Sequence, residues 1–393
     1  MKQYGVSIPL SCALALLISG FVLTSGCSAL FTEEGPLPRY LSPSPTKSLN
    51  ETPAIPAHND SSQVPLTIAA GIIQEVTVTQ NVSALTAPGT NTYHPLEVTI
   101  LPDNVPEYRT YKFRYRTDDY EISLPVNRSL YLAANKSANK GSIIDAKDLE
   151  SFYRQMLTDP ALDPFYDNIS QELNGMRYNG GRPFTDDEYL EFLVSFVQQI
   201  PTDGTVRTPR YPVEVVYNQK GTSDEKAILL AKLLAHEGYD TGLLIFRDRQ
   251  QAIAGIRIHL ATSNPSYRVF SDGMRDYMYI ESSTNRLIGI YPDEYETAPG
   301  PAIIPVGSGT ITYTKINSVL SIIYDLKTLK KKIDLLKQDS AKKDGVLKHE
   351  ADNALKSYVD TYNFVMSTND RLAAREAIRE SALPHYSACM SCD

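Results

Sequence analysis

The sequence predicts an α+β fold, in which helices pack on an antiparallel sheet, with a β-rich segment before this domain and an antiparallel helical hairpin after it. Two observations predict this arrangement. Short runs of β-branched and aromatic residues, separated by Pro, Asn, Asp and Gly, occupy residues 66–132 and recur after residue 241. Amphipathic patterns with three- and four-residue spacing lie between these two groups of runs and return near the C-terminus.

Composition and charge restrict the classes of function. The chain has 393 residues and a net charge of −8, and its 42% hydrophobic content is that of a globular protein. The acidic balance excludes the basic stripe that nucleic-acid binding requires, so we expect no nucleic-acid partner.

The cysteines are confined to the two ends of the chain, as Cys12, Cys27, Cys389 and Cys392. The body of the protein therefore has no thiol nucleophile, no disulfide framework and no four-cysteine zinc site.

The N-terminus has the pattern of an export signal. One early lysine, an apolar run over Val6–Val22 and a small-residue exit predict a signal peptide at 1–26. The Ser25-Gly26-Cys27 ending resembles a prokaryotic lipobox, which implies lipid attachment at Cys27; an uncleaved membrane anchor is the alternative. We expect an extracytoplasmic protein anchored to the cell membrane. Candidate glycosylation sequons agree with this location and begin at Asn50, Asn59, Asn81, Asn127, Asn135 and Asn168.

The elements follow in order from this point. Residues 27–64 are rich in Pro, Ser and Thr and are predicted to form an extended linker. Residues 65–105 form the β-rich segment. The predicted strands over this segment and the start of the next are Ile72–Thr79, Leu96–Leu101, Tyr111–Tyr115 and Tyr120–Leu124.

Helical signals come next. Ala146–Leu157 is amphipathic, and Thr185 with Glu188 forms a capping box that opens a second helix. Ser223–Glu237 is rich in leucine, and Gly238 ends it. Later strands are predicted at Gly242–Phe246, Ala252–Ile258 and Met278–Ser282.

The last module, residues 314–380, predicts the helical hairpin. Apolar residues from Val319 to Leu336 follow alternating three- and four-residue steps, and Ala351–Val365 repeats them after a break near Gly345. The tail at 381–393 contains a His385-x-x-x-Cys389-x-x-Cys392 pattern. Its two cysteines form either a disulfide or exposed dithiol, or part of a metal site.

The central motifs resemble the transglutaminase-like (papain-type cysteine peptidase-like) family, in its archaeal and bacterial exported lipoprotein type. The motifs are Tyr211-Pro212-Val213-Glu214, then Lys220-Gly221-Thr222-Ser223-Asp224-Glu225-Lys226, then a leucine-rich helix ending in Gly238-Tyr239-Asp240. Downstream, Ala252–Ile256 and Tyr279–Ser283 match the strands that carry the family's histidine and acidic residue. The resemblance covers about residues 106–300, and the domain it implies spans 106–313.

The resemblance places a catalytic triad on residues that cannot all perform its chemistry. In such enzymes a cysteine at a helix N-terminus attacks an amide carbonyl, a histidine acts as base and a carboxylate orients the histidine. The corresponding positions here are Ser223, Gln251 and Glu281. The pKa of a serine hydroxyl is far higher than that of a cysteine thiol. A helix dipole contributes only about 0.3–1 kcal/mol, which cannot close this gap. Without an adjacent base, the Ser223 hydroxyl is therefore expected to be inert. Only the acidic residue is retained.

Two competing hypotheses follow. In the first, the domain is non-catalytic and acts as a binding or structural module, with a protein, peptide or glycan partner at the cleft or the hairpin and no cofactor. In the second, the chain is an active hydrolase or amide-transferring enzyme that uses Ser223, with His259 as base and Glu281 as third member. His259 lies eight residues after Gln251, about 26 Å along a strand, which opposes the second hypothesis. His236 lies near the far end of the helix that Ser223 opens, and Ser223 also suits a helix N-cap.

Lipid attachment at Cys27 has a direct test. Mass spectrometry of the mature protein from membranes is expected to find a lipid-modified N-terminal cysteine at residue 27. A Cys27→Ala variant is expected to lose the lipid and retain the signal peptide. An unmodified N-terminus, or one upstream of Cys27 in the unaltered protein, would contradict the lipoprotein hypothesis.

Overall fold

The structure is a computed structural model that describes residues 93–103, 105–142, 146–178, 182–204, 209–259 and 267–382. The chain divides into two units, Met1–Gln74 and Glu75–Asp393, and all described residues belong to the second. The predicted signal peptide, linker and strand Ile72–Thr79 lie outside the described residues, as do Cys27, Asn50, Asn59, Asn81, Cys389 and Cys392. Within the described residues, no helix combines the length and apolar character needed to cross a membrane.

The described part is a mixture of helices and antiparallel sheet, which confirms the α+β prediction. A two-stranded hairpin, β1 (Glu107–Tyr115) and β2 (Asp118–Val126), precedes a helical region. The helices of this region are α2 (Arg128–Asn135), α3 (Ala146–Leu157), α4 (Asp163–Met176), α5 (Asp186–Gln198), α6 (Pro212–Asn218) and α7 (Ser223–His236). A five-stranded sheet follows, in the order β5-β6-β4-β3-β7, with every pair antiparallel.

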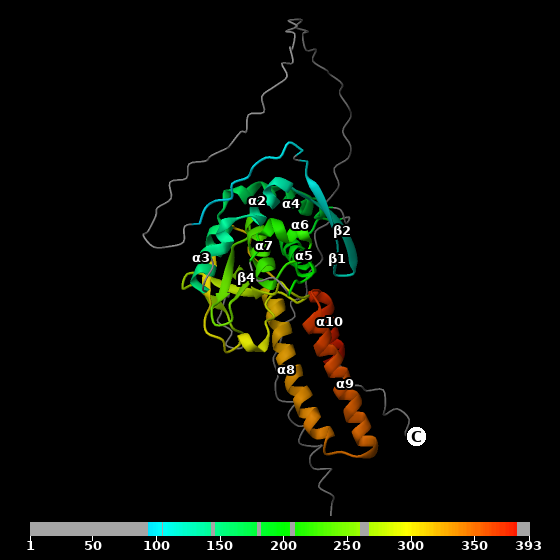
Figure 1. The fold of residues 1–393 in the computed structure, drawn as a ribbon. Coiled ribbons are helices and arrows are strands. Elements are labelled where there is room, and N and C mark those ends of the chain that lie inside the picture. The colour runs from blue at the N-terminus through cyan, green and yellow to red at the C-terminus, as the bar shows by residue number, and fades with distance from the viewer. Residues whose placement is uncertain are drawn as a thin grey trace, which may run out of the picture. The chain divides into compact units, whose positions relative to one another are not determined.

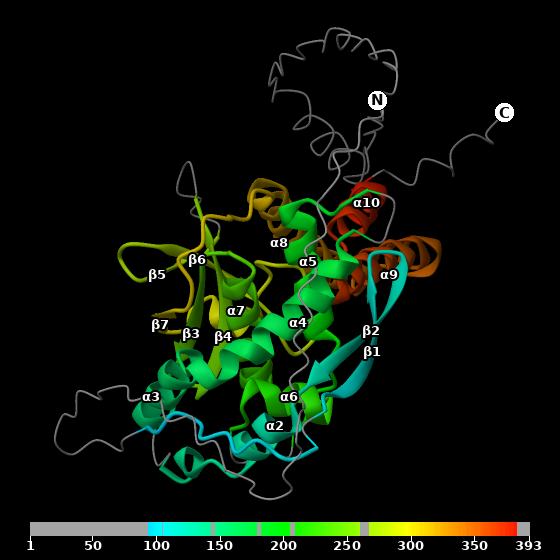
Figure 2. The same ribbon diagram turned by 90° about the horizontal axis from the view of Figure 1, so that it is seen from above.

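The five-stranded sheet buries both of its faces. Its strands are β3 (Thr241–Phe246), β4 (Gln251–Ile258), β5 (Phe270–Ser271), β6 (Asp276–Ile280) and β7 (Ala302–Pro305). Successive side chains alternate between faces: Leu243 and Ile245 join the core that contains α7, whereas Leu244 and Phe246 join an aromatic cluster on the other face. Helix α7 contacts β3 and β4 directly (Figure 2). Because both faces of the sheet are covered, its strands are apolar at successive positions rather than at every second one. The apolar runs that the sequence predicted as strands after residue 241 are strands in the structure.

One predicted strand is wrong. Residues 93–101 form no strand, although Leu96–Leu101 has a β-type sequence. The amide of Leu96 donates to the Asp159 carboxylate at 3.0 Å, and the amide of Leu101 donates to Ser129 Oγ at 3.0 Å. Tyr93 also donates to Asp159, at 2.6 Å. Side chains of the helical region therefore take the backbone hydrogen bonds that a neighbouring strand would have made, and this segment lies as a strap across the helices.

The hairpin β1–β2 is joined to the helical region by side chains. Gln199, just after α5, pairs with both backbone groups of Arg114: its Oε1 accepts from the Arg114 amide at 2.9 Å, and its Nε2 donates to the Arg114 carbonyl at 2.7 Å. Gln219, after α6, donates to the Thr110 carbonyl at 2.6 Å. These amides satisfy backbone groups of β1 that β2 does not reach.

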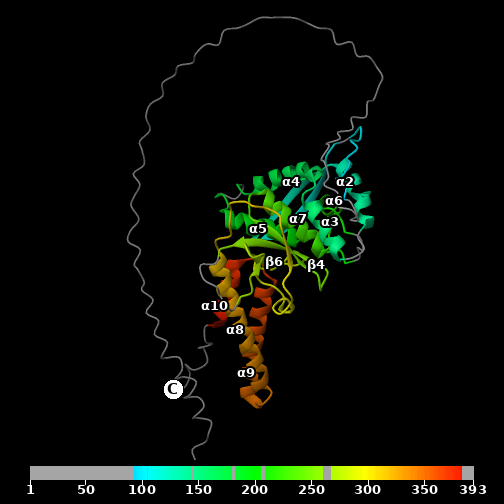
Figure 3. The same cartoon turned by 90° about the vertical axis from the view of Figure 1, so that its left-hand side faces the viewer.

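The C-terminal helices contain one element more than the hairpin that the sequence predicts. The two predicted helices are α8 (Ile316–Ser340) and α9 (Gly345–Ser367), which lie side by side (Figure 1). A third helix, α10 (Arg371–Ala382), contacts both of them (Figure 3). It was not predicted separately because Arg371–Ala382 has few large apolar residues.

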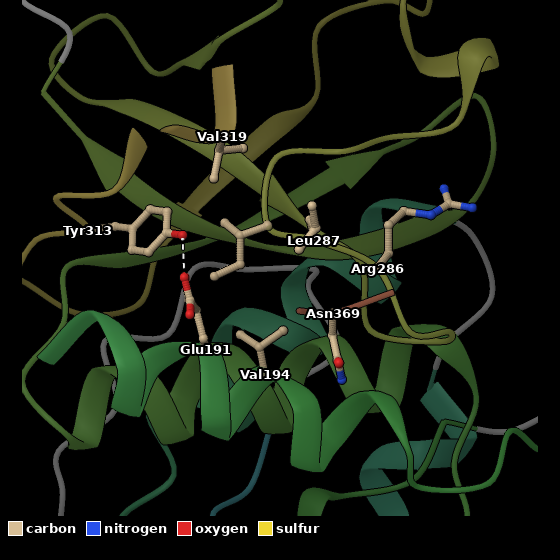
Figure 4. Close-up of a pocket in the computed structure, with 8 residues that line it drawn as sticks. Glu191, Val194, Arg286, Leu287, Tyr313, Val319 and Asn369 are labelled. Carbon is tan, nitrogen blue, oxygen red and sulfur yellow. Dashed lines mark hydrogen bonds between the residues drawn. The ribbon is translucent and has the colours of Figure 1, made fainter. Parts of the chain in front are cut away.

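A buried carboxylate connects the C-terminal helices to the domain. Glu191 of α5 accepts hydrogen bonds from Tyr313 Oη at 2.8 Å, Arg371 Nε at 3.0 Å and Tyr115 Oη at 3.3 Å, and it pairs with Arg116 at 3.5 Å. Figure 4 shows Glu191 and Tyr313 facing each other beside a cavity with room for about one water molecule. One side chain therefore joins the β1–β2 hairpin, α5, the entry to α8 and the start of α10.

Replacement of Glu191 by Gln is expected to destabilise the protein by about 3 kcal/mol, because two guanidinium groups would lose a buried partner. Chemical denaturation measures the loss, and hydrogen exchange is expected to rise in α10. Glu376→Gln, which breaks an exposed pair with Arg379 in the same helix, is the matched control and should change stability by less than about 0.5 kcal/mol. Equal effects of the two substitutions would contradict the role given to Glu191.

Candidate functional site

The structure brings the chain segments of the three predicted triad positions to one place. Ser223 is the first residue of α7, Gln251 is the first residue of β4, and Glu281 directly follows β6. The backbone amide of Ala252 donates to Asp224 Oδ1 at 3.1 Å, which joins the start of α7 to the start of β4. Ser282 Oγ donates to the Ser223 carbonyl at 2.9 Å, which joins α7 to the end of β6. We call Ser223, Asp224, Gln251, Glu281 and Ser282 the α7 site.

The start of α7 is fixed by a capping box one residue earlier than the sequence suggested. Thr222 is the N-cap: its Oγ1 accepts from the Glu225 amide at 3.3 Å, and Glu225 Oε2 accepts from the Thr222 amide at 2.8 Å. The suggestion that Ser223 is the N-cap is therefore wrong. Ser223 Oγ instead donates to Asp224 Oδ1 at 3.5 Å, the outer limit of a hydrogen bond.

Gln251 is held by a tyrosine from outside the sheet. Its Oε1 accepts from Tyr295 Oη, and Tyr295 belongs to the short 3₁₀ helix η3 (Asp293–Tyr295). Burial raises the pKa of Tyr295 to about 12, so the phenol keeps its proton and acts as a donor. The Tyr295 ring packs on Phe246 and Tyr279 and carries the Arg249 guanidinium 4.8 Å from its centroid. The amide is thus fixed, and an amide cannot accept a proton as an imidazole base does.

Both carboxylate oxygens of Glu281 accept hydrogen bonds from residues close to it in sequence. Its Oε1 accepts from the Ser282 amide at 3.0 Å, the Ser283 amide at 2.9 Å and Ser283 Oγ at 2.6 Å, while Oε2 accepts from Tyr279 Oη at 2.8 Å. Burial would raise the pKa of this carboxyl, but the hydrogen bonds from Ser283 and Tyr279 outweigh it, and the pKa is lowered. Glu281 is therefore an ionised carboxylate that shapes the turn after β6.

Asp224 is the hydrogen-bond partner of the Ser223 hydroxyl, and sequence reasoning gave it no role in the site. Burial raises the pKa of Asp224 to about 6, partly offset by hydrogen bonds from the Ala252 amide and from Tyr153 Oη at 3.4 Å. The geometry is unfavourable for proton transfer, because Ser223 Oγ reaches Asp224 Oδ1 only at 3.5 Å and that oxygen already accepts from the Ala252 amide. The pair does not replace the missing thiolate and imidazole.

Lys226 is a second residue that sequence reasoning missed. It is completely buried, and its Nζ donates to the carbonyls of Gln198 at 2.9 Å, Ile200 at 2.7 Å and Ser283 at 3.4 Å. Burial lowers the pKa of Lys226 to about 8, opposed by the negative charge of Glu281. A signal was present: Lys226 lies one helical turn before Leu229 and Leu230, on the buried stripe of α7.

The histidines weighed in the sequence do not belong to the α7 site. His259 follows the C-terminal end of β4, whereas Gln251 begins that strand. His236 ends α7, pairs with Asp167 at 3.0 Å and contacts the ring of Tyr166. The described residues also contain no group of three or more His, Cys, Asp or Glu side chains placed to hold a metal ion.

Three candidate glycosylation residues lie in the described part. Asn168 is exposed on α4, and Asn135 is exposed at the end of α2, where its amide donates to Glu214 at 3.2 Å. Asn127 caps α2 by accepting from the Ser129 and Leu130 amides, and Ser129, the hydroxyl residue of its sequon, is buried. Asn127 is therefore occupied as a helix cap, whereas Asn135 and Asn168 are exposed.

Comparison with known proteins gives little further information. No family model matches the sequence, and no curated protein matches it. Among solved structures, the chain is similar to LapG of Legionella pneumophila in its calcium-bound form. The similarity has 14% sequence identity and a TM-score of 0.21, and it covers 45% of this chain and 98% of the LapG chain. These values are too low to carry an argument about fold or chemistry.

Asp224 makes stability depend on pH. Its pKa is about 6 in the folded state, above the ordinary value of 3.8, so the folded state holds a proton that the unfolded state releases. Stability from this group is therefore present below pH 4 and is lost as the pH rises through 6. Relative to Asp224→Asn, the unaltered protein is expected to lose on the order of 2 kcal/mol between pH 4 and pH 7 in urea denaturation. A difference that stays constant with pH would contradict this.

Proposed function

We propose that this chain is an exported, membrane-anchored surface protein whose transglutaminase-like domain is non-catalytic and acts as a binding or structural module. The transglutaminase-like assignment rests on the motif resemblance. It is supported by the convergence of the matching positions: the start of the leucine-rich helix α7, the start of β4 and the end of β6 are hydrogen-bonded neighbours.

The observation that carries the proposal is the state of Gln251. The family's chemistry needs a base at this position to remove a proton from the nucleophile. Gln251 has no basic nitrogen, and its oxygen already accepts a hydrogen bond from Tyr295. Ser223 Oγ has the Asp224 carboxylate as its partner, but at 3.5 Å, the outer limit of a hydrogen bond, and on an oxygen that already accepts from the Ala252 amide. The active-enzyme alternative therefore lacks a well-placed base as well as the thiol.

The α7 site keeps groups suited to binding. Ser223, Asp224 and Gln251 are each partly exposed, and they offer a hydroxyl, a carboxylate and an amide. Their surroundings are rigid, since Glu281 and Lys226 fix the adjacent turn through several hydrogen bonds. Such preorganised polar groups suit the hydrogen-bonding backbone of a peptide or the hydroxyls of a glycan.

Covalent labelling separates the two hypotheses. The full chain is expected to show no labelling at Ser223 by a fluorophosphonate probe, because nothing activates its hydroxyl. Mass spectrometry of the digested protein measures this, with Ser223→Ala as the blank. Labelling at Ser223 that exceeds the blank would overturn the non-catalytic proposal.

The double variant Ser223→Cys with Gln251→His serves as the positive control. It restores the family's thiol and imidazole at the matched positions, and the cysteine is expected to react with iodoacetamide faster than that of Ser223→Cys alone. Because Tyr295 holds the side chain at position 251, Tyr295→Phe added to the double variant tests whether this hydrogen bond restrains the imidazole. Equal reactivity of the single and double variants would show that the site has changed beyond the two substituted residues.

A further inference from the structure

A short stretch of chain contacts both the α7 site and the C-terminal helices. We call residues 292–300, which contain η3 and precede β7, the η3 segment. Its only buried side chains are those of Tyr295 and Ala298. Within the described part of the chain, its backbone amides bond only inside the segment, and Arg268 is among the side chains that hold it, donating to the Tyr295 and Glu296 carbonyls. A segment with so few buried side chains can open locally while the rest of the fold stays intact.

One side of the η3 segment contacts the α7 site. Tyr295 donates a hydrogen bond to Gln251. The Arg249 guanidinium lies over the Tyr295 ring and donates to the Glu294 carbonyl at 2.9 Å. Ala298 packs with the Tyr295 ring in the aromatic cluster of the sheet. While the segment is seated in this way, the Gln251 amide is held by the tyrosine.

The other side of the η3 segment is paired with α8. Asp293 pairs with Lys330, and Glu296 pairs with Lys327 at 2.6 Å. All four side chains are more than one-third exposed. Exposed pairs contribute little to the stability of the whole protein, but both of these must break when the segment leaves α8. Their strength therefore changes the equilibrium between a seated and an open η3 segment.

We propose that the η3 segment couples the C-terminal helices to the α7 site, because its ion pairs to α8 keep it seated and their loss lifts Tyr295 from Gln251. Two states define this coupling. In the seated state the Tyr295–Gln251 hydrogen bond and the ion pairs to α8 are both formed, and in the open state both are broken. A change at α8 that breaks the ion pairs therefore frees the Gln251 amide for a ligand, and a ligand that binds the freed amide weakens the ion pairs in turn. As a means of regulation this rests on the binding role proposed for the α7 site.

A cysteine in place of Ala298 reports the opening of the η3 segment. Ala298 is 7% exposed, so the Ala298→Cys variant of the full chain is expected to react slowly with N-ethylmaleimide while the segment is seated. Mass spectrometry of the digested protein separates this cysteine from the four native ones. Tyr295→Phe in this background removes the hydrogen bond to Gln251 and keeps the ring. It is expected to raise the labelling rate about two- to tenfold.

A charge exchange tests the link to α8 in the same reporter background. Lys330→Glu replaces the attraction to Asp293 by a repulsion, and the labelling rate is expected to rise about two- to fivefold. Asp293→Lys added to Lys330→Glu restores a pair with the charges exchanged, and is expected to return the rate close to its starting value. Lys331→Glu makes the same change of charge at the exposed neighbouring position of α8 and is the matched control.

The coupling is refuted by an unchanged rate in Tyr295→Phe or Lys330→Glu, by a charge exchange that does not restore the rate, or by an equal rise in Lys331→Glu. Ala231→Cys, at a completely buried position of α7, measures general unfolding separately. An equal rise at position 231 in the Lys330→Glu protein would mean that the whole fold opens, which also overturns the proposal. Fluorophosphonate labelling of Ser223 would instead contradict the non-catalytic role of the α7 site and leave the coupling unaffected.

Discussion

The geometry of the α7 site depends on one buried charge. The Lys226 ammonium bonds to carbonyls at the C-terminal end of α5 and in the turn after β6, and so fixes two separate segments against the first turn of α7. Removing this ammonium from water costs several kcal/mol, which is reflected in its lowered pKa. Carbonyl oxygens at a helix C-terminus and the ionised Glu281 offset that cost. The positions of Ser223, Ser282 and Glu281 all follow from this arrangement.

Local sequence signals predicted much of the fold. The capping residues Thr185 and Glu188 form the box that their spacing indicates, and Gly238 ends α7 with a positive φ. These features depend on residues within one or two turns of each other. The strand predicted at Leu96–Leu101 does not form. The side chains that accept hydrogen bonds from its backbone, Asp159 and Ser129, are distant in sequence and are brought there only by the tertiary structure.

In the candidate site, too, the sequence predicted the positions marked by local motifs and missed the contacts between residues distant in sequence. The sequence identified Ser223, Gln251 and Glu281 as corresponding positions, and the structure places their segments together. The sequence did not identify Tyr295, which donates a hydrogen bond to Gln251, or the carbonyl groups that accept from Lys226. These contacts join residues that are distant in sequence, so local periodicity gives no sign of them. The spacing to Leu229 and Leu230 places Lys226 on the buried stripe of α7, but the carbonyls that accept from its ammonium are known only from the tertiary structure.

The strap at residues 93–101 determines how the domain responds to tension. A pull on the chain preceding Tyr93 first loads the bonds of Tyr93 and Leu96 to Asp159 and that of His94 to Asn139. These anchors lie in the helical region and are separate from the hydrogen bonds that assemble the α7 site. Mechanical strength on this side is governed by the rate at which the strap detaches rather than by the equilibrium stability of the fold. Detachment of the strap would lengthen the chain that leads into β1 without breaking the hydrogen bonds that join α7 to β4 and to the end of β6.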